Sequence, residues 1–168
     1  MSCDPNLLPI LQQLADALQQ RGWMLATAES CTGGMIAAAC TDLPGSSNWF
    51  DRGFVTYSND AKTEMLSVPA ALIAEHGAVS EAVVRAMAKG AITHSKAQVS
   101  VAVSGVAGPG GGTPEKPVGT VWVGLHINGH TRTQQLRLQG ERASIRAQTT
   151  SWAMAQLLTM LIAPSPHQ

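Results

Sequence analysis

The sequence predicts an α/β fold in which a mixed β-sheet is sandwiched between helices. Apolar runs typical of buried strands alternate with helical patterns up to residue 104. Asn128-Gly129 is a strong hairpin signal and predicts an antiparallel strand pair late in the chain. Because no internal repeat is visible, we expect one domain over residues 1–168, with its core between about residues 7 and 162.

The first elements follow from apolar spacing. Leucines recur at helical spacing over 6–21, so this segment is expected to be an amphipathic helix. Segment 23–27 is apolar and predicts a short buried strand, and the small residues of 35–40 predict a closely packed helix. Segment 49–57 predicts a second strand, with Gly53 as a bulge or a point of close approach.

The middle of the chain is expected to be mainly helical. Short helices are predicted over 61–66 and from Pro69 to Gly77, and a longer one over 80–92. The valine-rich segment 98–104 is typical of a strand covered on both faces. A glycine-rich turn over 105–119 follows, and it contains too few apolar residues to belong to the core.

The last third predicts a hairpin and a long helix. Strands over 118–127 and 131–138 are joined by Asn128-Gly129, which favours a type I′ turn. Apolar residues at helical spacing predict a helix over 141–162, and the tail 164–168 is expected to be frayed.

Composition argues against several classes of protein. The chain has 11 Lys and Arg against 11 Asp and Glu, so no overall field attracts nucleic acid or an acidic membrane. Cys3, Cys31 and Cys40 are odd in number and lack metal-ligand spacing, which argues against a disulfide framework and a structural zinc site. Since no signal peptide or membrane-spanning run is visible, we expect a soluble cytoplasmic protein.

Ser30 lies in the most informative segment, AESCTGG at 28–34, where an apolar strand gives way to a helix. At such a turn the hydroxyl can attack a carbonyl carbon while N–H groups of the first helical turn stabilise the oxyanion. Two alternatives stay open. Ser30 or Thr32 caps the helix and the glycines permit a tight turn, or Cys31 is the nucleophile because a helix N-terminus lowers its pKa.

Two further segments are expected at the same sheet edge, namely 57–62 and the turn that begins at Ser104-Gly105. Tyr57 and Lys62 can both face one pocket there, although such a pair is more often a packing or surface feature. A serine hydroxyl needs a base, and no histidine is near these turns in the sequence. Lys62 can serve if burial shifts its pKa from about 10.4 toward 7.

Two features could contact an anionic ligand. The glycine-rich segment from Gly108 to Pro114 lacks the Walker pattern, so it is a lid, a ligand wall or slack between strands. Arg142 and Arg146 lie one helical turn apart and can meet an anion together. Alternatively, the two arginines face solvent or pair with Glu141.

Four segments in this order resemble the CinA C-terminal domain family: TAESCTGG (27–34), VTYSNDAK (55–62), VSGVAGPGG (103–111) and KPVGTV (116–121). The resemblance runs from about residue 7 to residue 161. It implies a three-layer α/β/α fold with a mixed sheet. Because the family includes stand-alone deamidases, it also implies hydrolysis of nicotinamide mononucleotide to nicotinic acid mononucleotide and ammonia, in pyridine nucleotide salvage.

The same resemblance implies roles for individual residues. Ser30 is the expected nucleophile, Lys62 its base, and Tyr57 a residue that orients or assists them, with no metal and no cofactor. The arginine pair is the candidate site for the 5′-phosphate. The expected substrate-binding residues are Thr32, Gly33, Gly34, Ser104, Gly105, Gly108, Arg142 and Arg146.

The resemblance leaves one alternative function and one question of assembly. Many members carry a larger N-terminal domain, and we expect its pyrophosphatase activity to be absent here. A non-catalytic nucleotide-binding or partner-binding module remains the alternative. We expect a small nucleotide as the ligand, neither nucleic acid nor a membrane as a partner, and a homodimer, which an exposed hairpin edge and four tryptophans would suit.

Overall fold

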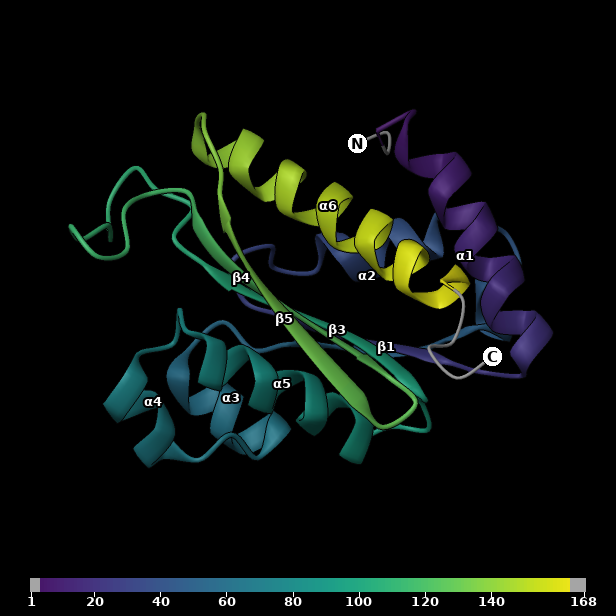
Figure 1. The fold of residues 1–168 in the computed structure, drawn as a ribbon, viewed down its shortest axis with the longest axis horizontal. Helices are drawn as coiled ribbons and strands as arrows, with labels where there is room; N and C mark the ends of the chain where they lie inside the picture. The colour runs from purple at the N-terminus through teal and green to yellow at the C-terminus, as the bar shows by residue number, and fades with distance from the viewer. Residues whose placement is uncertain (1–3, 164–168) are drawn as a thin grey trace.

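A computed structural model describes residues 4–163 (Figure 1). The first three strands are separated by helices, with three consecutive helices between the second and the third, and a hairpin and one long helix complete the chain. The elements are α1 (Leu7–Arg21), β1 (Leu25–Glu29), α2 (Met35–Thr41), the 3-10 turn η1 (Ser46–Asn48), β2 (Phe50–Val55), α3 (Asn59–Leu66), α4 (Ala70–His76), α5 (Glu81–Thr93), β3 (Val99–Gly105), β4 (Thr120–Ile127), β5 (His130–Arg137) and α6 (Arg142–Ile162).

The strands form one mixed sheet in the order β2-β1-β3-β4-β5. Strands β2, β1 and β3 are parallel, and β4 and β5 continue the sheet as antiparallel neighbours. Parallel strands end at the same edge of a sheet, so the residues that follow Glu29, Val55 and Gly105 meet at one carboxyl edge. The predicted mixed sheet is confirmed.

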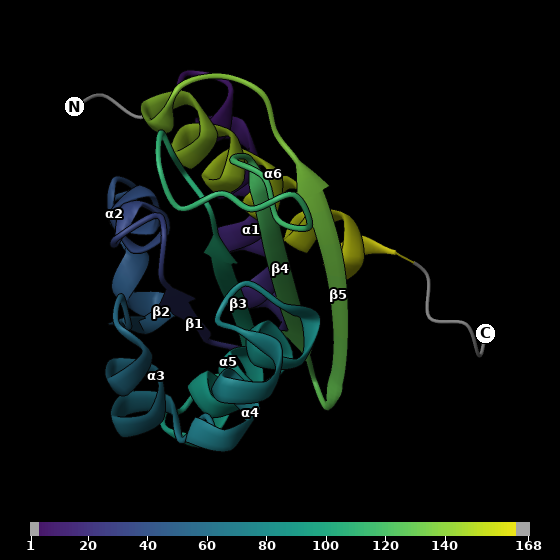
Figure 2. The same cartoon turned by 90° about the vertical axis from the view of Figure 1, so that its left-hand side faces the viewer.

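Helices cover both faces of the sheet, as Figures 1 and 2 show. One face packs against α1, α2 and α6, and the other against α3, α4 and α5, each through its own cluster of buried side chains. Alternation along β3 divides the clusters, since Val101 and Val103 belong to the first and Ala102 to the second. The three-layer α/β/α arrangement is therefore confirmed. No helix within residues 4–163 is long and apolar enough to cross a membrane.

The first two strands differ from their predicted limits in a way that matters for the site. Strand β1 covers residues 25–29 rather than 23–27, because Gly22 is left-handed and the N–H of Trp23 still bonds to the last turn of α1. The strand therefore ends directly before Ser30. Strand β2 ends at Val55, so Tyr57 lies in the following loop.

The other glycine and turn predictions fit the structure. A Cβ on Gly53 would approach Thr27 Oγ1 to 2.7 Å, so this glycine marks a close approach between neighbouring strands. Asn128 and Gly129 have φ values of 44° and 93°, as a type I′ turn requires. The predicted frayed tail, 164–168, lies outside the described residues.

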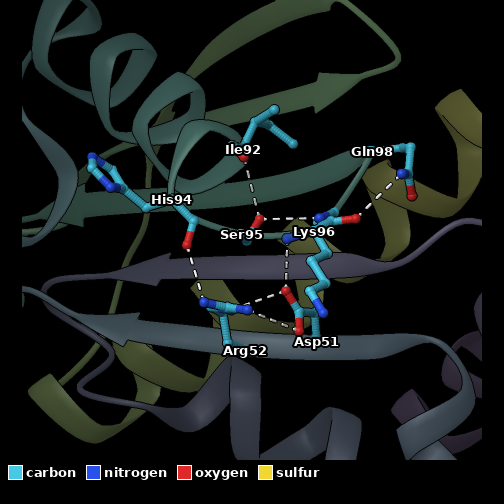
Figure 3. A network of polar contacts seen from close by, with 8 residues as sticks. Asp51, Arg52, Ile92, His94, Ser95, Lys96 and Gln98 are labelled. Atoms are coloured by element: carbon cyan, nitrogen blue, oxygen red, sulfur yellow. Dashed lines mark hydrogen bonds and ion pairs between the residues drawn. The ribbon is translucent and has the colours of Figure 1, made fainter.

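A polar network joins β2 to the segment that leads into β3, at the amino ends of the parallel strands (Figure 3). The Asp51 carboxylate accepts from the Lys96 N–H at 2.9 Å and pairs with Arg52, whose Nη1 donates to the His94 carbonyl at 3.2 Å. These contacts pin the sheet at the edge opposite the carboxyl ends.

Candidate active site

Ser30 and Lys62 meet at the carboxyl edge of the sheet. The Ser30 N–H donates to the Val103 carbonyl at 3.1 Å, which ties the residue after β1 to β3. Lys62 lies on α3, whose start is capped by the Ser58 hydroxyl accepting from the Ala61 N–H at 3.0 Å. The Lys62 Nζ lies 3.1 Å from Ser30 Oγ, within hydrogen-bond distance. The two residues expected to share a proton are thus in contact.

The Lys62 side chain is fully buried. Its Nζ donates to the carbonyl oxygens of Thr56 at 2.8 Å and Tyr57 at 3.2 Å, with that of Ser58 at 3.5 Å. Burial lowers the pKa of Lys62 below its ordinary value, and the charge of a Cys31 thiolate would oppose this shift. A neutral amine that donates two protons to carbonyls keeps a lone pair for the serine hydroxyl.

Glu29, the last residue of β1, performs the capping that the sequence analysis assigned to Ser30 or Thr32 as one alternative. Its buried carboxylate accepts the N–H groups of Ile36 at 2.9 Å and Ala37 at 3.0 Å, and Thr32 Oγ1 donates to it at 2.5 Å. Ser30 therefore has no capping contact with α2. Sequence analysis missed Glu29, although a carboxylate beside a helix N-terminus is a recognisable signal.

The capping contacts change the expected source of oxyanion donors. The N–H groups of Ile36 and Ala37 point to Glu29, and that of Met35 donates to the Thr32 carbonyl at 3.2 Å. The first turn of α2 is thus occupied. In the described structure, the N–H groups of this region without such an acceptor lie in the turn between Ser30 and α2.

Cys31 lines the same cavity but lacks the character of a reactive thiol. Only 5% of the residue is exposed, and this burial raises the pKa of the Cys31 thiol to about 11. The expectation of a lowered thiol pKa is wrong, because desolvation outweighs the nearby positive charges of Arg146 and Lys62. The Ser30 hydroxyl, in contrast, contacts the Lys62 amine at 3.1 Å.

A cavity of about 240 Å³ opens beside the Ser30–Lys62 pair. It is smaller than the roughly 300–1,000 Å³ of pockets that enclose whole drug-sized ligands, so it suits a ring-sized group whose remainder lies at the mouth. Its lining residues are Ser30, Cys31, Tyr57, Lys62, Ala78, Val79, Ser104, Gly105, Ala107 and Arg142. A larger hollow of about 420 Å³ runs along α1 beside Trp49 and contains none of the predicted residues.

One wall of the cavity was not anticipated. Ala78 and Val79 come from the short connection between α4 and α5, where only the helix break at Gly77 gave a signal. The Ser104 hydroxyl donates to the Ala78 carbonyl at 2.8 Å and holds this wall against β3. At Gly105 a Cβ would approach Val121 Cγ2 to 2.6 Å, so a side chain does not fit there.

The two arginines of α6 do different things. Arg142 lines the cavity, donating to the Gly108 carbonyl at 2.8 Å and to the Tyr57 hydroxyl at 3.3 Å. Arg146 does not line it, and its guanidinium instead binds the carbonyls of the turn after Ser30. The structure therefore brings only Arg142 to the cavity.

Tyr57 is 61% exposed as a residue, and its hydroxyl accepts from Arg142 at 3.3 Å. Its backbone carbonyl, not its phenol, contacts Lys62.

The glycines near the site have conformations that suit glycine. Gly33 and Gly34 have φ values of 59° and 108° in the turn before α2. The segment that includes Gly108 is ordered by several contacts rather than slack. Lys116 reaches from it to donate to the His76 carbonyl at 2.8 Å, while Arg142 holds its beginning.

No group of three or more His, Cys, Asp or Glu side chains that could hold a metal ion occurs in the described part of the chain. The functional groups that line the cavity are two serine hydroxyls, a buried amine, a thiol, a phenol and a guanidinium.

Similar proteins occur among known sequences and among solved structures. The family model described as the CinA C-terminal domain matches residues 8–161. The nicotinamide-nucleotide amidohydrolase PncC of Escherichia coli K12 is 48% identical over 155 residues, covering 92% of this chain and 94% of PncC. A CinA-like protein of Akkermansia muciniphila is 55% identical over 142 residues, which is 84% of this chain but 34% of that protein.

Among solved structures, the competence/damage inducible protein CihA of Agrobacterium tumefaciens superposes with a TM-score of 0.92 at 41% identity. The match covers 97% of this chain and 99% of that one.

Proposed function

The chain belongs to the CinA C-terminal domain family, and we propose that it is an amidohydrolase that converts nicotinamide mononucleotide and water to nicotinic acid mononucleotide and ammonia. The observation that carries this proposal is the 3.1 Å contact between Ser30 Oγ and the buried Lys62 Nζ, at the wall of a ring-sized cavity. The name of the E. coli relative, which covers nearly the same length, supports the substrate.

In the first step Ser30 Oγ attacks the amide carbon while its proton passes to Lys62. An amide is a poor electrophile, so base and oxyanion donors must act together. Burial of Lys62 favours the neutral amine that accepts this proton. The carbonyls of Thr56 and Tyr57 fix Nζ beside the hydroxyl, so little reorganisation is needed.

In the second step the tetrahedral intermediate collapses and its C–N bond breaks. Lys62, now an ammonium, returns the proton to the leaving nitrogen, and ammonia departs. An ester of Ser30 remains. Water then attacks this ester with Lys62 again taking a proton, and the acid is released as Ser30 recovers its hydrogen.

The substrate's charged end is assigned to the mouth of the cavity. The proposed position of the nicotinamide ring is the cavity of about 240 Å³, and Arg142, which lines this cavity, is the proposed partner of the 5′-phosphate. We propose that the enzyme works in the cytoplasm on a free nucleotide, with neither nucleic acid nor a membrane as partner.

Ammonia release tests the proposal. Ser30→Ala and Lys62→Met should each lower kcat on nicotinamide mononucleotide by at least about 10³-fold, since both members of the pair are needed for every proton transfer. Matched controls are Ser47→Ala and Lys89→Met, which alter exposed residues on η1 and α5 and should keep the wild-type rate. Tight nucleotide binding by the wild-type protein without ammonia release over hours would instead support a non-catalytic binding module.

A further inference from the structure

Arg146 makes contacts that a phosphate-binding residue does not need. It projects from α6 and is half-buried. Its Nε donates to the Cys31 carbonyl at 3.0 Å and its Nη2 to the Thr32 carbonyl at 3.2 Å. No carboxylate lies within ion-pair distance of it among residues 4–163. The guanidinium therefore binds the carbonyl groups of the two residues that follow Ser30.

These contacts set the direction of the opposite N–H groups. In a trans peptide the C=O and the following N–H point in opposite directions. Binding the Cys31 carbonyl thus turns the Thr32 N–H away from the guanidinium. Binding the Thr32 carbonyl does the same for the Gly33 N–H, which is used within the turn by donating to the Ser30 carbonyl at 3.1 Å.

Few donors then remain near Ser30 Oγ. The N–H groups of Ile36 and Ala37 are held by Glu29, and that of Met35 donates to the Thr32 carbonyl. Those of Cys31, Thr32 and Gly34 have no backbone carbonyl acceptor in the described structure. The peptide whose carbonyl Arg146 binds at 3.0 Å carries the Thr32 N–H, so this is the group whose direction the guanidinium sets most directly.

The turn is held from its other side as well. Thr32 Oγ1 donates to the buried Glu29 carboxylate, so one residue is fixed through its side chain by Glu29 and through its carbonyl by Arg146. The guanidinium also packs on the turn, since a Cβ on Gly33 would lie 3.5 Å from Nη2. A cation on a peptide oxygen also polarises that peptide and strengthens its N–H as a donor.

We propose that Arg146 is a positioning residue for the oxyanion: it orients and polarises the Cys31–Thr32 peptide so that the Thr32 N–H stabilises the developing charge. This inference rests on Ser30 being the nucleophile. It assigns the two arginines of α6 separate tasks, with Arg142 at the cavity and Arg146 behind the reacting turn.

The test compares Arg146→Met with Arg142→Met on two substrates, nicotinamide mononucleotide and its riboside, which lacks the phosphate. Arg146→Met should lower kcat by about 10²-fold on each substrate that the wild type hydrolyses, with little change in KM, as loss of an oxyanion donor does. Arg142→Met should raise KM for the mononucleotide only. An Arg146→Met effect confined to KM for the mononucleotide would overturn the proposal.

A second readout is independent of the nucleotide. A fluorophosphonate probe phosphonylates an activated serine, with loss of fluoride, through a transition state that also needs oxyanion donors. The probe should therefore label Ser30 about 10²-fold more slowly in Arg146→Met than in the wild type. An unchanged labelling rate would refute the role of Arg146. Wild-type protein that labels rapidly but releases no ammonia would refute the proposed substrate while leaving this test valid.

Arg146→Lys covers the case in which Arg146→Met does not fold, as judged by thermal melting. Lysine keeps the charge and one donor but not the fork that binds two carbonyls. Its labelling rate should lie between those of wild type and Arg146→Ala, and added guanidinium ion should restore part of the Arg146→Ala rate. A wild-type rate in Arg146→Lys and no rescue of Arg146→Ala would show that the fork only supports the fold.

Discussion

Lys62 is fully buried, so its charged form is destabilised by the loss of hydration. Three carbonyl oxygens surround Nζ, and they satisfy its protons without supplying a negative charge. The ordinary compensation for a buried lysine, a carboxylate partner, is not seen for Lys62 in residues 4–163. The desolvation of the ammonium is therefore not compensated by a carboxylate, and the neutral amine is favoured.

The pH dependence of the reaction should report this amine. Because burial lowers the pKa of Lys62 from 10.5, kcat/KM should rise as pH increases through a value below 10.5 and then level off. Steady-state ammonia release from neutral to alkaline pH measures this rise in kcat/KM. A rise at the pKa of an exposed lysine would contradict this assignment, and Lys89→Met serves as the control that should leave it in place.

Single residues show what a linear sequence can and cannot reveal. Ser30 and Lys62 were predicted because a strand-to-helix turn and a nearby helix start bring their residue types to one sheet edge. The capping by Glu29 and the carbonyl contacts of Arg146 were not predicted. Both contacts depend on which groups a long side chain reaches once α2 and α6 have packed. Local residue spacing does not reveal these long-range contacts.

The β4–β5 hairpin has a histidine built into its turn. His126 Nε2 accepts from the Gly129 N–H at 3.2 Å, and Nδ1 lies 2.8 Å from Thr131 Oγ1. Burial lowers the pKa of His126, with the charges of Lys89 and His130 adding to the effect. A protonated ring cannot accept from Gly129, so acid should open this turn.

Stability should fall on acidification for this reason. The pKa of His126 is higher in the unfolded chain, about 6.5, than in the folded protein, so unfolding takes up a proton as pH drops below that value. Urea unfolding at about pH 7.5 and about pH 5 should show a loss that His126→Gln reduces. His76→Gln, which alters an exposed histidine on α4, is the matched control. A pH effect in His126→Gln equal to that of the wild type would refute the prediction.

Lys116 links the glycine-rich segment to the end of α4 across the cavity rim. Its Nζ donates to the His76 carbonyl beside the Ala78–Val79 wall. Lys116→Ala should therefore increase amide hydrogen exchange at 77–80 and 106–119 while the sheet stays protected. Lys96→Ala, which alters an exposed side chain at the opposite edge, is the comparison. Equal exchange in Lys116→Ala and wild type would show that the bond contributes nothing to order.

Elements were predictable in kind and order but not in their limits. Apolar patterns together with proline and glycine signals indicated the helices and strands, and the Asn128-Gly129 turn formed as expected. The ends of β1 and β2 moved by two residues because strand ends are decided by the neighbour across the ladder, which the sequence does not name. That shift is functional, since it sets Ser30 directly after the strand.

The arrangement of the whole molecule combines predictable and unpredictable parts. Mixed sheet and three layers followed from element order and from the family resemblance, and the solved CihA structure shares the fold. Which helices share a face did not follow, because α2 and α6 are distant in sequence yet contribute side chains to the same buried cluster.

The homodimer expected from the sequence is also a prediction about the whole molecule. Strand β5 stands at the end of the strand order, so its outer edge has no partner strand within residues 4–163. Exposed edges pair readily with other chains, and a homodimer is the simplest closed assembly. Sedimentation velocity at micromolar concentration should give the mass of two chains. A concentration-independent monomer would contradict it, and activity that persists in that monomer would show that one chain holds a complete site.

The network of Asp51, Arg52 and Lys96 has a practical meaning for anyone who handles this molecule. It joins β2 to the segment before β3 at the end of the sheet opposite the Ser30–Lys62 cavity. Linkers to a solid support, fusion partners and stabilising crosslinks are best attached at that end, because they leave the entrance of the Ser30–Lys62 cavity free.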